Sequence, residues 1–82
     1  MDKGKRLKFF RTKHLKFTQE KFAGVLKISQ PSLSRYELGV TPVPTEIIDI
    51  LIEKYNLNAN WFYTGRGSSM VRSLEDIIRG EN

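Results

Sequence analysis

Residues 18–39 have the sequence T-Q-E-K-F-A-G-V-L-K-I-S-Q-P-S-L-S-R-Y-E-L-G, and the rest of the predicted fold is arranged around them. This sequence predicts two short helices joined by a tight turn. Thr18 is a favourable N-cap for the first of them, and Ser29 is a favourable N-cap for the second. Pro31 fits the first turn of the second helix, because an amide at that position has no helical partner to lose. Gly39 supplies a left-handed end to that helix.

The apolar residues in this stretch recur at helical spacing, so each of the two helices has one inward face. Ala23 is small, which lets the second helix cross the first closely. The residues that we expect to face the core are Phe22, Ala23, Leu26, Ile28, Leu33 and Tyr36.

The same stretch resembles the helix-turn-helix of the phage repressor and Cro family, also called the XRE or lambda-repressor-like family. The positions that match are Gln19, Ala23, Ile28, Ser29-Gln30, Leu33-Ser34-Arg35-Tyr36-Glu37 and Gly39. The resemblance implies a compact, all-α, five-helix DNA-binding domain in which helices 2 and 3 form the helix-turn-helix. The chain departs from the family at Lys27, a turn position that often holds glycine. A left-handed backbone there costs a non-glycine residue on the order of 1 kcal/mol.

An α-helix fits the major groove of B-DNA, where each base pair presents a distinct edge, and the resemblance gives this role to the helix beginning at Gln30. The predicted base-reading residues are Gln30, Pro31, Ser34 and Arg35. The predicted phosphate-binding residues are Thr18, Gln19, Lys27, Ser32 and Thr41. In the alternative interpretation the two glutamines are ordinary solvated side chains, and Arg35 forms a surface ion pair with Glu37 or another acidic residue. The resemblance also implies that Arg11 pairs with Glu37 and ties the first helix to the third.

The charge is unevenly distributed along the chain, whose net charge is +5 over 82 residues. Residues 1–27 hold nine Lys/Arg against two Asp/Glu, a balance of +7, whereas residues 28–82 hold five against seven, a balance of −2. A basic front half indicates a surface for a polyanion, although a simple solvated surface is the alternative. With 39% hydrophobic residues the composition is that of a globular domain. No apolar run approaches the roughly 20 residues of a membrane span.

The residue types that carry catalysis or bind metals are scarce. There are no cysteines and a single histidine, His14. Disulfides and thiolate metal sites are therefore ruled out, and one histidine does not build a metal site alone. Paired acids and nucleophile–base sets are also missing from the motifs. The sequence predicts a protein that is not an enzyme and needs no cofactor or metal, and the lack of cysteine fits the cytoplasm.

Three further helices complete the expected fold, and the first of them covers residues 3–14. Compared with the family, the link from Arg11 to Thr18 is one residue longer, which predicts a bulge in the turn over residues 14–17. The fourth helix is expected over residues 47–55 and the fifth over residues 59–64. In the fourth, the apolar stripe predicts that the core residues are Ile48, Leu51, Ile52 and Tyr55, with Ile47 and Ile50 outside it.

The end of the chain is expected to differ from the rest. We predict a DNA-binding domain over residues 1–67 and a C-terminal segment over residues 68–82, which forms either a short sixth helix over residues 73–78 or a frayed tail. In the fifth helix Phe62 is expected to close the core, while Trp61 covers a peripheral patch or a subunit contact. One helix-turn-helix contacts few base pairs, so a homodimer is expected to present two such helices roughly 34–36 Å apart. The candidates for its interface are Ile47, Ile50, Trp61, Leu74, Ile77 and Ile78.

These observations favour a sequence-specific regulator of transcription that binds double-stranded DNA, a repressor of bacterial or phage type on a palindromic operator. The alternative is an antitoxin-like protein or a controller of a restriction–modification operon, which shares the fold and acts partly through a protein partner such as a toxin or an antirepressor. A third interpretation is the DNA-binding domain of a longer repressor.

Overall fold

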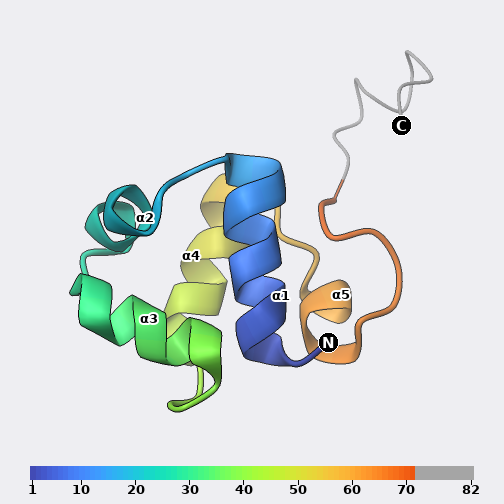
Figure 1. Ribbon diagram of the computed structural model, residues 1–82. Coiled ribbons are helices and arrows are strands. Elements are labelled where there is room, and N and C mark those ends of the chain that lie inside the picture. The colour runs from blue at the N-terminus through green and yellow to red at the C-terminus, as the bar shows by residue number, and fades with distance from the viewer. Residues whose placement is uncertain (72–82) are drawn as a thin grey trace.

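The computed structural model describes residues 1–71, and this part of the chain is built from helices. The order is α1 (Lys3–Phe9), the π-helix η1 (Phe10–Leu15), α2 (Gln19–Leu26), α3 (Gln30–Leu38), α4 (Thr45–Tyr55) and α5 (Ala59–Thr64). In Figure 1, α1 stands between α3 and α5, α4 lies between α1 and α2, and α2 lies beside the start of α3. The predicted all-α architecture is confirmed. The expected sixth helix lies outside the described residues.

Local signals fix both ends of the helix-turn-helix, α2 and α3. The Thr18 hydroxyl accepts from the Lys21 amide at 3.1 Å, and the Ser29 hydroxyl accepts from the Ser32 amide at 3.2 Å. Gly39 ends α3 in the left-handed region with φ of 77°. The turn between the helices places Lys27 at φ of 59°, so the chain does adopt a left-handed backbone at a residue other than glycine.

The first helix changes its winding partway along. From Phe10 to Leu15 it is a π-helix, which closes at left-handed Lys16, whose amide donates to the Arg11 carbonyl. A π-helical turn takes up one more residue than an α-helical turn. The extra residue that we expected as a bulge in the 14–17 turn is therefore accommodated mainly within the helix, and the predicted position was wrong.

The core gathers side chains from every helix. Phe22, Ala23, Leu26 and Leu33 are buried as expected, together with Leu7, Phe10, Ile48, Leu51, Leu57 and Phe62. In α4 the predicted stripe is confirmed at Ile48 and Leu51 and wrong at its edge: Ile47 is 4% exposed and Ile52 is 36% exposed. Because this helix carries apolar residues at most of its positions, two neighbouring stripes satisfy the helical period, and packing selects between them.

Trp61 also lies deeper than predicted. It is 8% exposed and packs against the Phe9 ring, with 5.8 Å between the ring centroids. Adjacent residues on a helix point in different directions, yet α5 is enclosed on more than one side. Phe62 points into the main core, and Trp61 fills the contact between α5 and α1. The burial of Ile47 and Trp61 within one protomer leaves them little surface for a subunit interface.

Residues 68–71 pack against the chain that precedes α5. The backbone amide of Asn58 donates to the Ser69 carbonyl at 3.0 Å, and the backbone amide of Val71 donates to the Asn56 carbonyl at 2.7 Å. The side chain of His14 is hydrogen-bonded to the Ser69 hydroxyl. The packed chain thus continues to residue 71, past the boundary expected at residue 67. Within the described residues, no helix has the length and apolar character to cross a membrane.

Candidate nucleic-acid interface

Three of the four predicted base-reading residues are well exposed on α3. Gln30, Pro31 and Arg35 are exposed, and Ser34 is half-buried. Gln30 and Ser34 are four residues apart and therefore follow one another along the same side of the helix. The structure thus brings the predicted reading residues together on a surface of α3 that the described chain leaves open.

A buried ion pair joins α1–η1 to the end of α3. Arg11 Nε donates to Glu37 Oε2 at 2.7 Å, and Arg11 Nη2 donates to Glu37 Oε1 at 3.0 Å, so the contact is bidentate. Arg11 is 8% exposed and Glu37 is 5% exposed. Arg11 Nη1 also donates to the Phe17 carbonyl at 3.0 Å, in the link to α2. The pair that the family resemblance implies is present, and it braces three segments against one another.

The ion pair continues outward as a chain of hydrogen bonds that ends on the reading surface. Gln19 Nε2 donates to Glu37 Oε1 at 3.1 Å, and Gln30 Nε2 donates to Gln19 Oε1 at 3.3 Å. Neither glutamine is an isolated solvated side chain. Gln19 links the buried carboxylate to Gln30, and this arrangement leaves Gln30 Oε1 open to accept a further hydrogen bond.

Within residues 1–71, Arg35 forms no ion pair with an acidic residue. The carboxylate of Glu37 is occupied by Arg11 and Gln19, and the Arg11–Glu37 contact is the single ion pair within residues 1–71. Arg35 Nη2 instead lies 3.5 Å from the Ser32 hydroxyl, which also accepts from the Ser29 hydroxyl at 2.8 Å. The surface ion pair between Arg35 and Glu37 is therefore not formed, and the guanidinium stays exposed.

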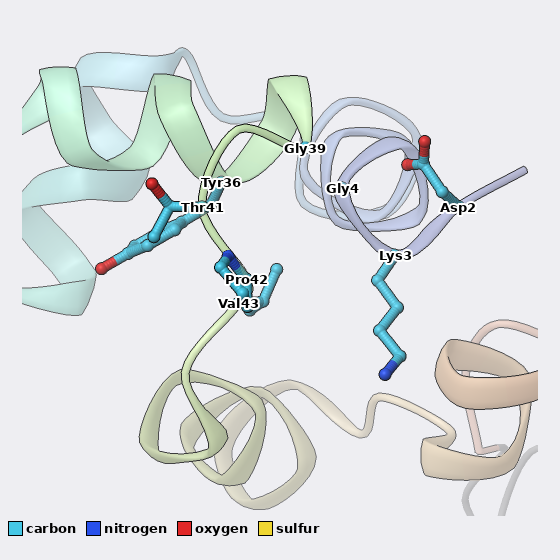
Figure 2. Close-up of a pocket in the computed structure, with 8 residues that line it drawn as sticks. All are labelled: Asp2, Lys3, Gly4, Tyr36, Gly39, Thr41, Pro42 and Val43. Atoms are coloured by element: carbon cyan, nitrogen blue, oxygen red, sulfur yellow. The ribbon is translucent and has the colours of Figure 1, made fainter.

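The predicted phosphate-binding residues lie at both ends of α3. Thr18 and Gln19 open α2, where free backbone amides and the positive end of the helix favour an anion. Lys27 is exposed in the turn that leads to α3. Thr41 lies at the opposite end, after Gly39, where it lines a cavity of about 350 Å³ between the start of α1 and the loop over residues 41–43 (Figure 2). Thr41 is thus separated along α3 from the rest of the predicted set.

Gly4 is a structural residue of the site that the sequence analysis missed. The start of α1 crosses the end of α3 beside Gly39 (Figure 2). A Cβ atom at Gly4 would lie 2.5 Å from the Tyr36 carbonyl oxygen and 2.8 Å from that of Glu37. Only glycine allows the two backbones to approach so closely. A lone glycine within an otherwise basic helical run was the signal available in the sequence.

Within residues 1–71 no group of three or more His, Cys, Asp or Glu side chains is placed to hold a metal ion. The chemistry available at the exposed surface of α3 is hydrogen bonding by amide, hydroxyl and guanidinium groups. These groups suit the recognition of base edges and phosphates.

Comparison with known proteins agrees with this geometry. A family model described as a helix-turn-helix domain matches residues 4–68. The chain belongs to this helix-turn-helix family. Among curated proteins, it is similar to antitoxin PezA of Streptococcus pneumoniae serotype 4, with 47% identity over 55 residues. The match covers 67% of this chain and 34% of PezA, so the chain spans about a third of that relative's length. No solved structure matches the chain.

Proposed function

We propose that this helix-turn-helix protein is a sequence-specific regulator of transcription, a repressor that binds a palindromic operator in double-stranded DNA as a homodimer. In this proposal α3 enters the major groove and α2 rests across the phosphates. Gln30 and Arg35 read base edges, with Pro31 and Ser34 beside them. Thr18, Gln19, Lys27, Ser32 and Thr41 contact phosphates. A protein with this role works in the cytoplasm beside the DNA that it controls.

The observation that carries the proposal is the hydrogen-bonded chain from Arg11 through Glu37 and Gln19 to Gln30. A glutamine that reads adenine must present its carboxamide in a fixed orientation, because the discrimination comes from two directed hydrogen bonds. Gln19 holds the Gln30 carboxamide from one side, and Gln19 is itself held by a carboxylate that is 5% exposed. Such preorganisation lowers the entropy that binding must otherwise remove.

The homodimer follows from the small footprint of one reading helix, which contacts only a few base pairs. Of the residues that the sequence suggested for the interface, Ile50 is half-buried, and Leu74, Ile77 and Ile78 lie outside the described residues. Because Ile47 and Trp61 belong to the core of the protomer, we propose that Ile50 and the C-terminal residues contribute to the contact instead.

Replacing Gln30 or Arg35 with alanine is expected to remove base discrimination rather than binding as a whole. Each good bidentate contact between a side chain and a base supplies about 1–3 kcal/mol of discrimination. Titration of an operator duplex and of duplexes with single base-pair changes measures that discrimination for each variant. Lys54→Ala, which removes an exposed side chain of α4, serves as the control. Equal discrimination by Gln30→Ala and the unaltered protein would contradict the assigned role of Gln30.

A second function is favoured by the similarity to antitoxin PezA. In this alternative the chain is an antitoxin-like protein or an operon controller that binds DNA and also acts through a protein partner. The two functions are separated by expressing the neighbouring gene with and without this chain. Growth arrest that only the intact chain relieves supports the antitoxin-like function, and a neighbouring gene without any such effect favours regulation of transcription alone.

A further inference from the structure

Lys5 and Lys8 form an exposed pair of positive charges on α1, which we call the basic ridge. The DNA contacts proposed for the helix-turn-helix do not use these two side chains. Both side chains are exposed, and neither forms an ion pair within residues 1–71. The nearby carboxylate of Asp2 accepts from the backbone amide of Lys5 at 2.8 Å and serves as the helix cap. The basic ridge therefore presents two positive charges that the described chain leaves unneutralised.

The basic ridge lies at the solvent edge of the contact between α1 and α3. Gly4, Lys8 and Arg11 are separated by four and three residues and follow one side of the first helix. Gly4 meets the α3 backbone and Arg11 meets Glu37, so this side of α1 faces α3. Lys8 lies between them in sequence but is exposed, which places it at the rim of the contact. Lys5 lies three residues before Lys8, on the adjacent exposed side of α1.

The reading residues of α3 border the same contact. Gln30, Ser34 and Glu37 are separated by four and three residues and form one stripe along α3. Since Glu37 is the member that binds Arg11, this stripe lies on the edge of α3 that faces α1 and the start of α2. Figure 1 shows α1 standing directly beside the second half of α3. The basic ridge and the reading stripe therefore both lie next to the contact between α1 and α3.

We propose that the basic ridge binds phosphates of the DNA strand that borders the groove occupied by α3. This inference rests on the proposed function and extends its contact surface from the helix-turn-helix onto α1. Packed helices lie about 8–10 Å apart, and the major groove is about 12 Å wide. A lysine on the helix next to the reader therefore reaches the sugar–phosphate backbone at the groove edge. Each phosphate so neutralised releases counterions and steepens the salt dependence of binding.

The test is the salt dependence of duplex binding by the double variant Lys5→Gln/Lys8→Gln. The slope of log K against log salt is expected to become shallower by about 1.8 for each bound protomer, because each lost phosphate contact removes about 0.9. The relative affinities for different base sequences are expected to stay as they are in the unaltered protein, since phosphates carry no base information. Fluorescence anisotropy over a series of salt concentrations gives both quantities.

Two further variants distinguish a local phosphate contact of the basic ridge from the electrostatic effect of the protein's overall positive charge. Lys54→Gln removes an exposed positive charge from α4, and we expect it to leave the slope nearly unchanged. Lys5→Arg/Lys8→Arg keeps both charges and is expected to keep the slope. An unchanged slope in Lys5→Gln/Lys8→Gln, or an equal change per charge in Lys54→Gln, would overturn the inference. These slopes are measurable on any duplex, so failure of the unaltered protein to prefer one sequence would contradict the proposed function separately.

Discussion

Replacing Arg11 with methionine is expected to lower the free energy of unfolding by about 3–5 kcal/mol, the range found when one partner of a buried ion pair is removed. The variant keeps the carboxylate of Glu37, a residue that is 5% exposed, and within residues 1–71 Gln19 is the one side-chain donor left to it. It also loses the hydrogen bond from Arg11 to the Phe17 carbonyl. Small domains are stable by about 5–15 kcal/mol, so this change takes a large share of the total. Urea unfolding at low temperature measures the loss.

The matched control is Lys13→Met, which removes a positive charge from the same helix at an exposed position. Its effect is expected to stay within about 0.5 kcal/mol. Replacing both partners, as in Arg11→Met/Glu37→Met, is expected to recover much of the loss, because no buried charge is left without a partner. A double-mutant cycle then gives the coupling energy of the pair. An Arg11→Met variant as stable as Lys13→Met would show that the pair does not brace the fold.

Replacing Gly4 with alanine is expected to destabilise the protein by about 1–3 kcal/mol, which is typical of overpacking. The added methyl group would lie 2.5 Å and 2.8 Å from two backbone oxygens of α3, and neither oxygen moves unless α3 moves. This result runs against helix propensity, which favours alanine over glycine within helices by roughly 0.5–1 kcal/mol. Thermal or urea unfolding measures the change.

Gly24→Ala is the control for this variant, because Gly24 lies within α2 and a Cβ atom there meets nothing within 4 Å. We expect it to stabilise the protein by roughly 0.5–1 kcal/mol, the gain from propensity alone. The two substitutions are chemically identical, but their effects on the free energy of unfolding should have opposite signs. If Gly4→Ala is as stable as Gly24→Ala, α1 and α3 do not pack as closely as the structure has them.

The helix-turn-helix was predictable because its signals are local. Thr18, Ser29 and Gly39 each act on the backbone within a few residues, so their roles as caps follow from the sequence. The left-handed backbone at Lys27 was not predicted, because Lys27 stands at a turn position that often holds glycine in the family. The pairing of Arg11 with Glu37 spans 26 residues and was expected only through the family resemblance.

The features that sequence analysis missed depend on how distant elements pack. The stripe of α4 was misassigned because its period fits Ile52 as well as Ile47, and only the position of the neighbouring helices decides between them. Trp61 is buried by Phe9, which is remote in sequence. The π-helix over residues 10–15 takes up the extra residue of the link between Arg11 and Thr18, and Arg11 contacts Glu37 26 residues further along the chain. The role of Gly4 likewise appears only when α1 and α3 are placed together.

Selection from random duplexes by the unaltered protein at physiological salt shows whether the exposed side chains of α3 read DNA sequence. We expect enrichment of an inverted repeat whose half-sites are centred about 10–10.5 base pairs, or a multiple of that spacing, apart. Bound duplexes with no more shared sequence than the starting pool would contradict this role of α3.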